Sequence, residues 1–249
     1  MIMNLKPICL TVFTVVFLSL VMLMNGLSVM IQGSDYEAEN VLSEYDATDM
    51  SQYYVMGEYY PPDDVDTINI DWQGGRVEII AYDGDYYFME EAATRQLQEP
   101  ERLSYTLNGN EFSVYFSDSE ENAVKDAYKK LEIRIPKDVA ALLKKVNINT
   151  NGEVVLKNIK ADSVTVNGTD GNVFCDNTYS KNMYVYTKSG NVDLILSEKT
   201  GYKLHFDTQS GNADTYFEMD GGSYSCGDEL YSFNVKTGKG NLSASSSNE

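Results

Sequence analysis

The chain contains three stretches that align on a glycine: NTNGEVVL at residues 149–156, GTDGNVFC at 168–175 and TKSGNVDL at 187–194. Apolar residues stand two and four places after each glycine. Alternation with a period of two is typical of a β-strand that buries one face. Glycine permits a positive φ at a tight corner. Each unit of about 20 residues is therefore predicted to be a strand, a glycine turn and a second strand.

The same spacing extends on both sides of these stretches. The anchoring glycines are separated by 19, 19, 21 and 29 residues and are Gly152, Gly171, Gly190, Gly211 and Gly240. The residues two places after them are Val154, Val173, Val192, Ala213 and Leu242, and those four places after are Leu156, Cys175, Leu194, Thr215 and Ala244. Apolar pairs also precede the glycines, namely Val146/Ile148, Val164/Val166, Met183/Val185, Leu204/Phe206 and Phe233/Val235. Thr215 is the polar member of its column and weakens the fourth unit.

An earlier copy of the signature surrounds Gly75, with Ile68 and Ile70 before it and Val77 and Ile79 after it. We interpret this copy as a first rung. A single hairpin cannot bury its apolar face, whereas stacked units form a continuous core. The sequence therefore predicts an all-β protein, a β-solenoid or β-helix-like stack of strand–Gly-turn–strand repeats. An antiparallel meander or sandwich would show similar alternation, but the near-constant spacing favours the solenoid.

The N-terminus contains a long uncharged segment, Ile8–Ile31. Its 24 residues can cross about 30 Å of hydrocarbon as a helix. No Ala-x-Ala cleavage pattern follows it, so an uncleaved signal anchor is expected rather than a cleaved signal peptide. Lys6 is the base that precedes it, and the positive-inside rule places the N-terminus in the cytoplasm. We therefore expect a single-pass protein of the cell membrane with an extracellular C-terminal domain.

Residues 34–66 carry ten acidic residues, six tyrosines and no base. Charge repulsion and the pair Pro61-Pro62 favour an extended spacer, although a binding strip or a metal-binding arm would have the same composition. The predicted organisation is a signal anchor at 1–33, an acidic stalk at 34–66, an N-terminal β region with the first rung at 67–137, a repetitive solenoid at 138–245 and a disordered tail at 246–249.

Charge and histidine content exclude several function classes. The chain has 38 acidic and 19 basic residues, a formal net charge of −19, and one histidine. Nucleic-acid binding needs a clustered basic face, so nucleic acid is not an expected partner. A single histidine argues against a His-rich metal site and a His-based catalytic triad.

The few chemically distinctive side chains have ordinary structural explanations. His205 stands between two apolar residues and is expected to face solvent. Cys175 falls on an inward position and Cys226 on an insertion, so the pair is either a disulfide of an exported domain or two free thiols. Two aspartate groups, Asp63/Asp64/Asp66 and Asp207/Asp214/Asp220, lack the pattern of a calcium loop. We therefore assign no catalytic, cofactor-binding or metal-binding residues and no cofactor.

Three motifs together resemble the DUF4097 family of bacterial β-strand-repeat proteins, which are described as candidate adhesins. They are Ile68-x-Ile70-x-Trp72-x-x-Gly75-x-Val77-x-Ile79, Leu131-x-Ile133-x-Ile135-Pro136, and the repeated Thr-x-Ser-Gly-Asn at Thr187–Asn191 and Thr208–Asn212. The resemblance spans roughly residues 65–245. It implies a repetitive, often membrane-attached β protein, with a link to envelope stress in some members, and it supplies no catalytic residues.

These observations predict a non-enzymatic protein that acts by display at the cell envelope. The expected partners are the membrane, through the anchor, and an envelope protein, a wall polymer or a second copy bound through β edges. Nineteen tyrosines would support adhesion or carbohydrate stacking, or would simply be strand formers. Two alternatives stay open: an accessory or sensor of a membrane signalling partner, and a wall-directed glycan hydrolase or lyase.

Overall fold

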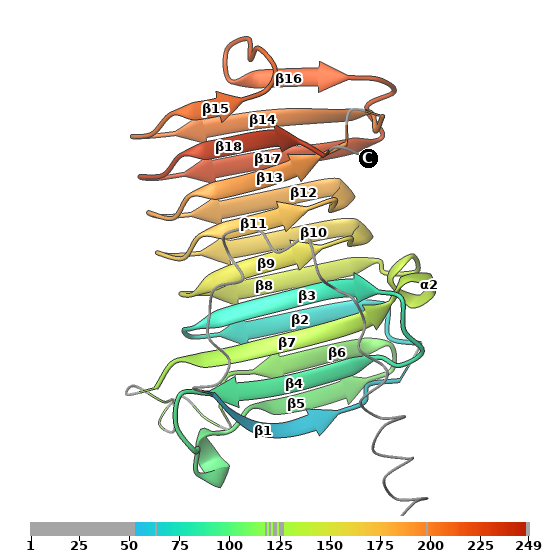
Figure 1. Cartoon of the computed structure of the whole chain (residues 1–249), viewed down its shortest axis with the longest axis vertical. Coiled ribbons are helices and arrows are strands. Elements are labelled where there is room, and N and C mark those ends of the chain that lie inside the picture. Colours follow the sequence, from blue (N-terminus) through green and yellow to red (C-terminus); the bar gives the residue numbers. More distant parts are fainter. Residues whose placement is uncertain are drawn as a thin grey trace, which may run out of the picture. The chain divides into compact units, whose positions relative to one another are not determined.

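The computed structural model describes residues 53–247, apart from 63, 118, 120, 122, 123, 125, 126 and 198. The described residues form two nine-stranded sheets, which we call sheet A and sheet B (Figure 1). Sheet A has the strand order β1 (Tyr54–Tyr59), β4 (Phe88–Ala93), β7 (Lys129–Pro136), β3 (Arg76–Tyr82), β9 (Glu153–Lys157), β11 (Val173–Asp176), β13 (Val192–Leu196), β18 (Leu242–Ser246), β15 (Ala213–Thr215). Sheet B has the order β16 (Ser223–Cys226), β14 (Tyr202–Thr208), β17 (Tyr231–Thr237), β12 (Tyr179–Thr187), β10 (Lys160–Gly168), β8 (Lys145–Thr150), β2 (Thr67–Trp72), β6 (Glu111–Tyr115), β5 (Ser104–Asn108). A helical turn α2 (Lys137–Ala140) follows β7, and a 3-10 turn η3 (Glu99–Glu101) precedes β5.

Each repeat unit gives one strand to sheet B and the next strand to sheet A, and we call such a pair a rung. The rungs β8/β9, β10/β11 and β12/β13 pair with one another in parallel in both sheets. Parallel pairing of successive units excludes the antiparallel meander. Antiparallel strands lie at the two ends of the stack, where β4 and β1 extend sheet A, β5 extends sheet B, and β16 covers β14. The all-β prediction is thus confirmed, as two mixed sheets.

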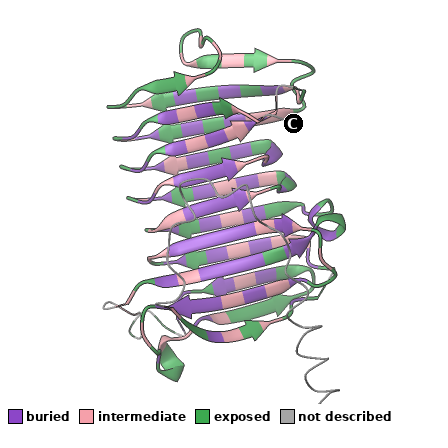
Figure 2. Ribbon diagram, viewed as in Figure 1, coloured by how far each residue is buried: buried purple, intermediate pink, exposed green. Residues whose placement is uncertain are grey.

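The predicted columns of apolar residues are present and form the core between the sheets (Figure 2). In sheet A one column runs, in spatial order, through Val77, Val154, Val173, Val192, Leu242 and Ala213. In sheet B the matching column runs through Ile68, Val146, Val164, Met183, Phe233 and Leu204. All of these side chains are at most 1% exposed except Ala213, which lies on the edge strand β15. The core therefore continues through the rungs and ends at the weak fourth unit.

The spatial order of the rungs differs from their order in the sequence. The last rung in the chain, β17/β18, lies between β12/β13 and β14/β15. At the other end β2/β3 lies between β6/β7 and β8/β9, so the rung that we interpreted as the first is an interior one. The C-terminal segment consequently completes the interior of the stack rather than extending its end.

The repeat glycines stack directly on one another. A Cβ atom on Gly171 would overlap the carbonyl oxygen of Gly152, and the same relation holds between the other neighbours in the spatial series Gly75, Gly152, Gly171, Gly190, Gly240, Gly211. Among these six, only Gly75 has a positive φ, of 82°. The expectation that glycine serves a positive φ at each corner is therefore wrong for the other five. Glycine is needed there because backbones of adjacent rungs approach closely.

The rung β6/β7 carries a lysine where the glycine column would continue. A Cβ on Gly75 would overlap the backbone of Lys129. The ammonium of Lys129 is fully buried, lies 2.5 Å from the Glu91 carboxylate, and donates to the carbonyl oxygens of Glu101 and Phe116. It also lies 5.0 Å from the centre of the Trp72 ring. A buried charge is stable only with such partners. These contacts therefore stabilise the end of the stack, where β4 pairs antiparallel with β7.

Two predicted boundaries need correction. The predicted stalk at 34–66 overlaps the folded part, because Tyr54–Tyr59 form β1 and the side chains of Met56 and Val65 are buried. The predicted tail at 246–249 begins too early, because Ser246 belongs to β18 and the Ser247 amide donates to the Leu196 carbonyl oxygen at 2.9 Å. Apolar side chains and strand pairing explain both differences.

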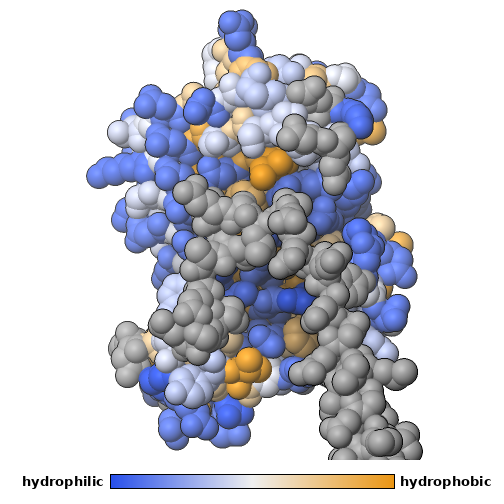
Figure 3. All heavy atoms as spheres, viewed as in Figure 1, coloured by the Kyte–Doolittle hydropathy of each residue, from blue (hydrophilic) through white to orange (hydrophobic). Residues whose placement is uncertain are grey.

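The predicted anchor at 1–33 and stalk residues 34–52 lie outside the described residues. Within the described ranges, no helix combines the length and the apolarity that crossing a membrane requires. The face seen in Figure 3 is mostly hydrophilic where described residues are visible, with separate apolar patches.

Candidate ligand-binding face

The outward positions of sheet B form rows of polar and aromatic side chains. Inward and outward residues alternate along each strand, so the residues between the buried columns face away from the core. Parallel register then aligns one outward residue from each strand. One of these rows, which we call the Asp71 row, runs across β6, β2, β8, β10 and β12 and consists of Tyr115, Asp71, Asn149, Asn167 and Tyr186.

A second row lies beside the first, two residues earlier on each strand. It contains Ser113, Asn69, Asn147, Thr165 and Tyr184. Asparagine is a poor strand former, but identical amides stacked on neighbouring strands hydrogen-bond to one another. The Asn147 Nδ2 donates to the Asn69 Oδ1 at 2.7 Å, and the Asn167 Nδ2 donates to the Asn149 Oδ1 at 3.1 Å. These bonds fix the planes of the amides on the outer face.

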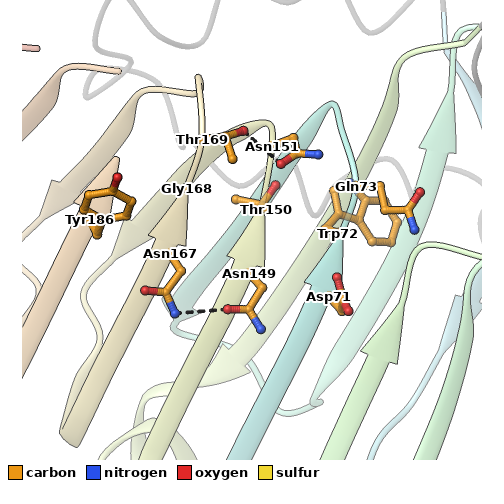
Figure 4. A pocket seen from close by; sticks show the side chains of 10 residues that line it. All are labelled: Asp71, Trp72, Gln73, Asn149, Thr150, Asn151, Asn167, Gly168, Thr169 and Tyr186. Carbon is orange, nitrogen blue, oxygen red and sulfur yellow. Dashed lines mark hydrogen bonds between the residues drawn. The ribbon is translucent and has the colours of Figure 1, made fainter. Parts of the chain in front are cut away.

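Three depressions lie along these rows, and Asp71 lines all of them. One of about 310 Å³ lies among Asp71, Asn149, Asn167 and Tyr186 (Figure 4). A second of about 500 Å³ includes Asn69, Asn147 and Thr165 of the second row, and a third of about 440 Å³ includes Tyr105 and Tyr115. The three depressions share residues, so they form one continuous polar surface over neighbouring strands of sheet B.

The chemistry of this surface suits hydrogen bonding and ring stacking. The Asp71 carboxylate accepts hydrogen bonds, the asparagine amides both donate and accept, and serine and threonine hydroxyls do either. The tyrosines Tyr105, Tyr115 and Tyr184 are 47%, 40% and 41% exposed. The described residues that line the three depressions include no histidine, cysteine, lysine or arginine. Such a surface can form hydrogen bonds with a polar ligand. The cation next to it in register is Lys236 on β17, which follows Tyr186 and is paired with Asp207 at 3.1 Å.

A separate depression surrounds the lone histidine. His205 lies outward on β14, as the sequence predicts, and its Nδ1 is 3.0 Å from the Ser223 Oγ. The insertion after β15 folds back as β16, antiparallel to β14, and brings Glu218 and Asp220 to the same depression of about 560 Å³. Within this insertion, a bridge joins Asp220 and Ser223 across the turn at Gly221-Gly222.

The two described cysteines are both free thiols. Cys175 is fully buried in the core column, and burial raises the pKa of its thiol to about 12. Cys226 is half-buried, and its Sγ lies 3.7 Å from the Thr200 carbonyl oxygen. The structure therefore favours the free-thiol alternative over a Cys175–Cys226 disulfide.

The aspartate groups do not converge. Asp66 bonds to Lys144 at 2.6 Å, and this hydrogen bond lowers the pKa of Asp66. Asp207 pairs with Lys236 at 3.1 Å. Asp63 lies outside the described residues. Among the residues that the structure describes, no three His, Cys, Asp or Glu side chains are grouped so that they could hold a metal ion.

Sequence reasoning identified the inward columns and missed the outward rows. The signal was present between the apolar positions, as Asn69-Ile-Asp71, Asn147-Ile-Asn149 and Thr165-Val-Asn167. Across the repeat, these positions place amides and carboxylates on the same face of successive strands.

A family model and a solved structure support the fold described above. A family model described as Toastrack DUF4097 matches residues 65–248. A candidate cell adhesion protein from Clostridium sporogenes has a similar structure, with a TM-score of 0.60 and 13% identity over 78% of this chain and 100% of that chain. Candidate adhesins from Bacteroides fragilis (TM-score 0.31, 11% identity, 77% and 96% covered) and Parabacteroides merdae (0.29, 10%, 78% and 96%) also match. No curated protein matches the chain.

Proposed function

The chain belongs to the Toastrack DUF4097 family, and from this premise we propose that it is a membrane-anchored, exported, non-enzymatic protein that displays the outer face of sheet B. The anchor in this proposal is the uncharged segment Ile8–Ile31. The stack then presents its polar rows to a component of the cell envelope. The single observation that carries the proposal is the Asp71 row, where one continuous polar and aromatic surface crosses five neighbouring strands.

Two features support binding rather than bond chemistry. The surface lacks a lysine, arginine, cysteine or histidine among the described residues that line its depressions. A lyase would need a cation beside its substrate, and these residues supply none. A glycan hydrolase would use two carboxyl groups, so acid-to-amide changes at Asp71 and Glu111 test that alternative. The Clostridium sporogenes protein of similar fold is named as a candidate in cell adhesion, which agrees with a display role.

The test uses the full-length chain in its membrane. Protease added to intact cells should remove the β stack, and carbonate washing should leave the chain in the membrane fraction. Detergent-solubilised full-length chain should then retain envelope fragments on a resin. The variant Asp71→Ala/Asn149→Ala should lose most of this retention. The matched control is Asn212→Ala, a corner residue whose side chain is exposed.

Two outcomes would overturn the proposal. One is a protease-resistant stack in intact cells, which would place the domain inside. The other is equal retention of envelope by wild type and the Asp71→Ala/Asn149→Ala variant. A purified chain that cleaves wall glycan or peptide, with loss of activity on an acid-to-amide change, would support the enzyme alternative instead.

A sensor role is the second candidate, and the depression around His205 favours it. That depression brings Lys203, Glu218 and Asp220 beside the single histidine of the chain. Deletion of the gene would then alter an envelope-stress reporter without reducing envelope binding. His205→Gln would reproduce the reporter change, whereas Asp71→Ala would leave it unaltered.

A further inference from the structure

We infer that the ligand of the Asp71 row is an uncharged polysaccharide chain that lies across the strands of sheet B; this inference rests on the proposed function. The row has a defined pattern along its length. Tyr115 on β6 and Tyr186 on β12 flank three hydrogen-bonding side chains, Asp71, Asn149 and Asn167. The register continues to Ser104 on β5 beyond Tyr115 and to Lys236 on β17 beyond Tyr186.

The spacing of the row matches a linear sugar polymer. Neighbouring strands in a sheet lie about 4.8 Å apart, a distance comparable to the length of one pyranose ring in an extended chain. A polysaccharide placed at right angles to the strands therefore presents about one ring to each rung. An extended polypeptide on the same face would meet few of the apolar pockets that usually give peptide specificity.

The side chains of the row match the surface of a sugar. Planar amides and a carboxylate can bond to two adjacent hydroxyl groups at once, since they present two polar atoms in one plane. Tyrosine rings pack against the apolar C–H face of a pyranose, and their hydroxyls stay in water. The polar residues of the row and the two tyrosines that flank them therefore suit a ligand with hydroxyl edges and apolar faces.

The amides are held in place before a ligand arrives. The Asn167 side chain donates to Asn149, and on the adjacent row Asn147 donates to Asn69, which donates in turn to the Glu111 carboxylate at 2.5 Å. Side chains that are already ordered lose less conformational entropy on binding. Asn149 and Asn167 remain exposed on the outer face of sheet B.

The charges of this face and of the whole chain favour an uncharged polymer over an anionic one. The carboxylates of Asp71 and Glu111 line the same depression, and the chain has a formal net charge of −19. Lys236, which follows Tyr186 in register, is paired with Asp207 at 3.1 Å. Like charges across an interface are costly and slow association, so a polymer of phosphates or uronic acids is disfavoured. An uncharged chain meets no such repulsion.

The experiment measures binding of three probes to the detergent-solubilised full-length chain by calorimetry. The probes are a hexamer of N-acetylglucosamine, a hexamer of glucose, and polygalacturonate as the anionic comparison. At least one uncharged hexamer should bind, and polygalacturonate should not. Tyr115→Ala and Tyr186→Ala should each weaken binding about 10-fold, because each removes one stacking platform. Tyr86→Ala is the matched control, because Tyr86 is 67% exposed and lies outside the row. Thermal melting confirms that each variant is folded.

Three results would overturn this inference, and the second of them would leave the proposed function standing. Binding of polygalacturonate in preference to both hexamers would overturn the inference. Retention of envelope that depends on Asp71 and Asn149 but is not competed by either hexamer would also overturn it, and would leave the proposed function standing. Loss of hexamer binding in Tyr86→Ala but not in Tyr186→Ala would place the site elsewhere and contradict the inference.

Discussion

The carbonyl oxygen of Gly152 occupies the space that a Cβ atom on Gly171 would need. The two residues belong to neighbouring rungs, and their backbones touch at the corner between sheet B and sheet A. Because the obstacle is backbone, it cannot move without shifting a whole rung. The repeated glycine of the sequence is therefore a requirement of stacking.

The first prediction concerns this contact. Gly171→Ala should lower the free energy of unfolding by about 3 kcal/mol or more, since overpacking against backbone is costlier than against a side chain. Gly74→Ala is the matched control, because a Cβ there meets nothing within 4 Å. Urea unfolding of both variants measures the difference. Equal stability of the two would contradict the stacked corner.

The second prediction tests the order of the rungs. A chain truncated after residue 229 lacks β17 and β18, which lie between β12/β13 and β14/β15. Residues 202–226 should then lose protection in hydrogen–deuterium exchange, because β14 loses its parallel partner. Residues 145–157 in the same sample serve as the internal control and should stay protected. Retained protection of 202–226 would mean that β14 packs directly on β12.

The third prediction concerns the buried pair of Lys129 and Glu91, both fully buried and 2.5 Å apart. Lys129→Met should cost about 3–5 kcal/mol, because it leaves a buried carboxylate without its counter-ion. The double variant Lys129→Met/Glu91→Gln should be more stable than Lys129→Met alone. A double-mutant cycle in urea measures the coupling, and strict additivity would show that the pair does not interact.

The fourth prediction concerns acid stability. Arg95 bonds to both oxygens of Glu101, at 2.7 and 2.9 Å, and lowers the pKa of that carboxyl from its ordinary value of 4.5 to about 2. A carboxyl with a lowered folded-state pKa stabilises the fold above pH 4.5, and this contribution is lost as the pH falls from 4.5 towards 2. Glu101→Gln should therefore show a shallower loss of stability over this range. Parallel pH profiles for wild type and variant would rule out the pair as a source of acid sensitivity.

The inward columns could be predicted from the sequence because they depend on local periodicity. Val154, Val173 and Val192 repeat at 19-residue intervals, and in-register parallel strands convert that interval into a column. The order of the rungs could not be predicted in the same way. Each rung has a similar apolar pattern, so the pattern does not say that Leu242 lies between Val192 and Ala213.

The buried ion pair at the end of the stack could not be predicted, for a different physical reason. Lys129 occupies the corner where other rungs have glycine, and a buried lysine has no periodic signature. Its partner Glu91 lies 38 positions earlier in the chain, on an antiparallel strand.

The candidate site could have been predicted from the sequence, because Asp71 and Asn149 hold equivalent outward positions in successive repeats. Outward residues of a repeat therefore need the same column-by-column comparison as inward ones.

The most direct test of the display surface is photocross-linking in intact cells. A benzoyl-phenylalanine placed at Tyr186, on the Asp71 row, should yield a covalent adduct that contains envelope polymer. The same group at Tyr86, which is 67% exposed and outside the row, should yield little or none. Adducts of equal yield at the two positions, or adducts at position 86 alone, would contradict the proposal that the outer face of sheet B is the binding surface.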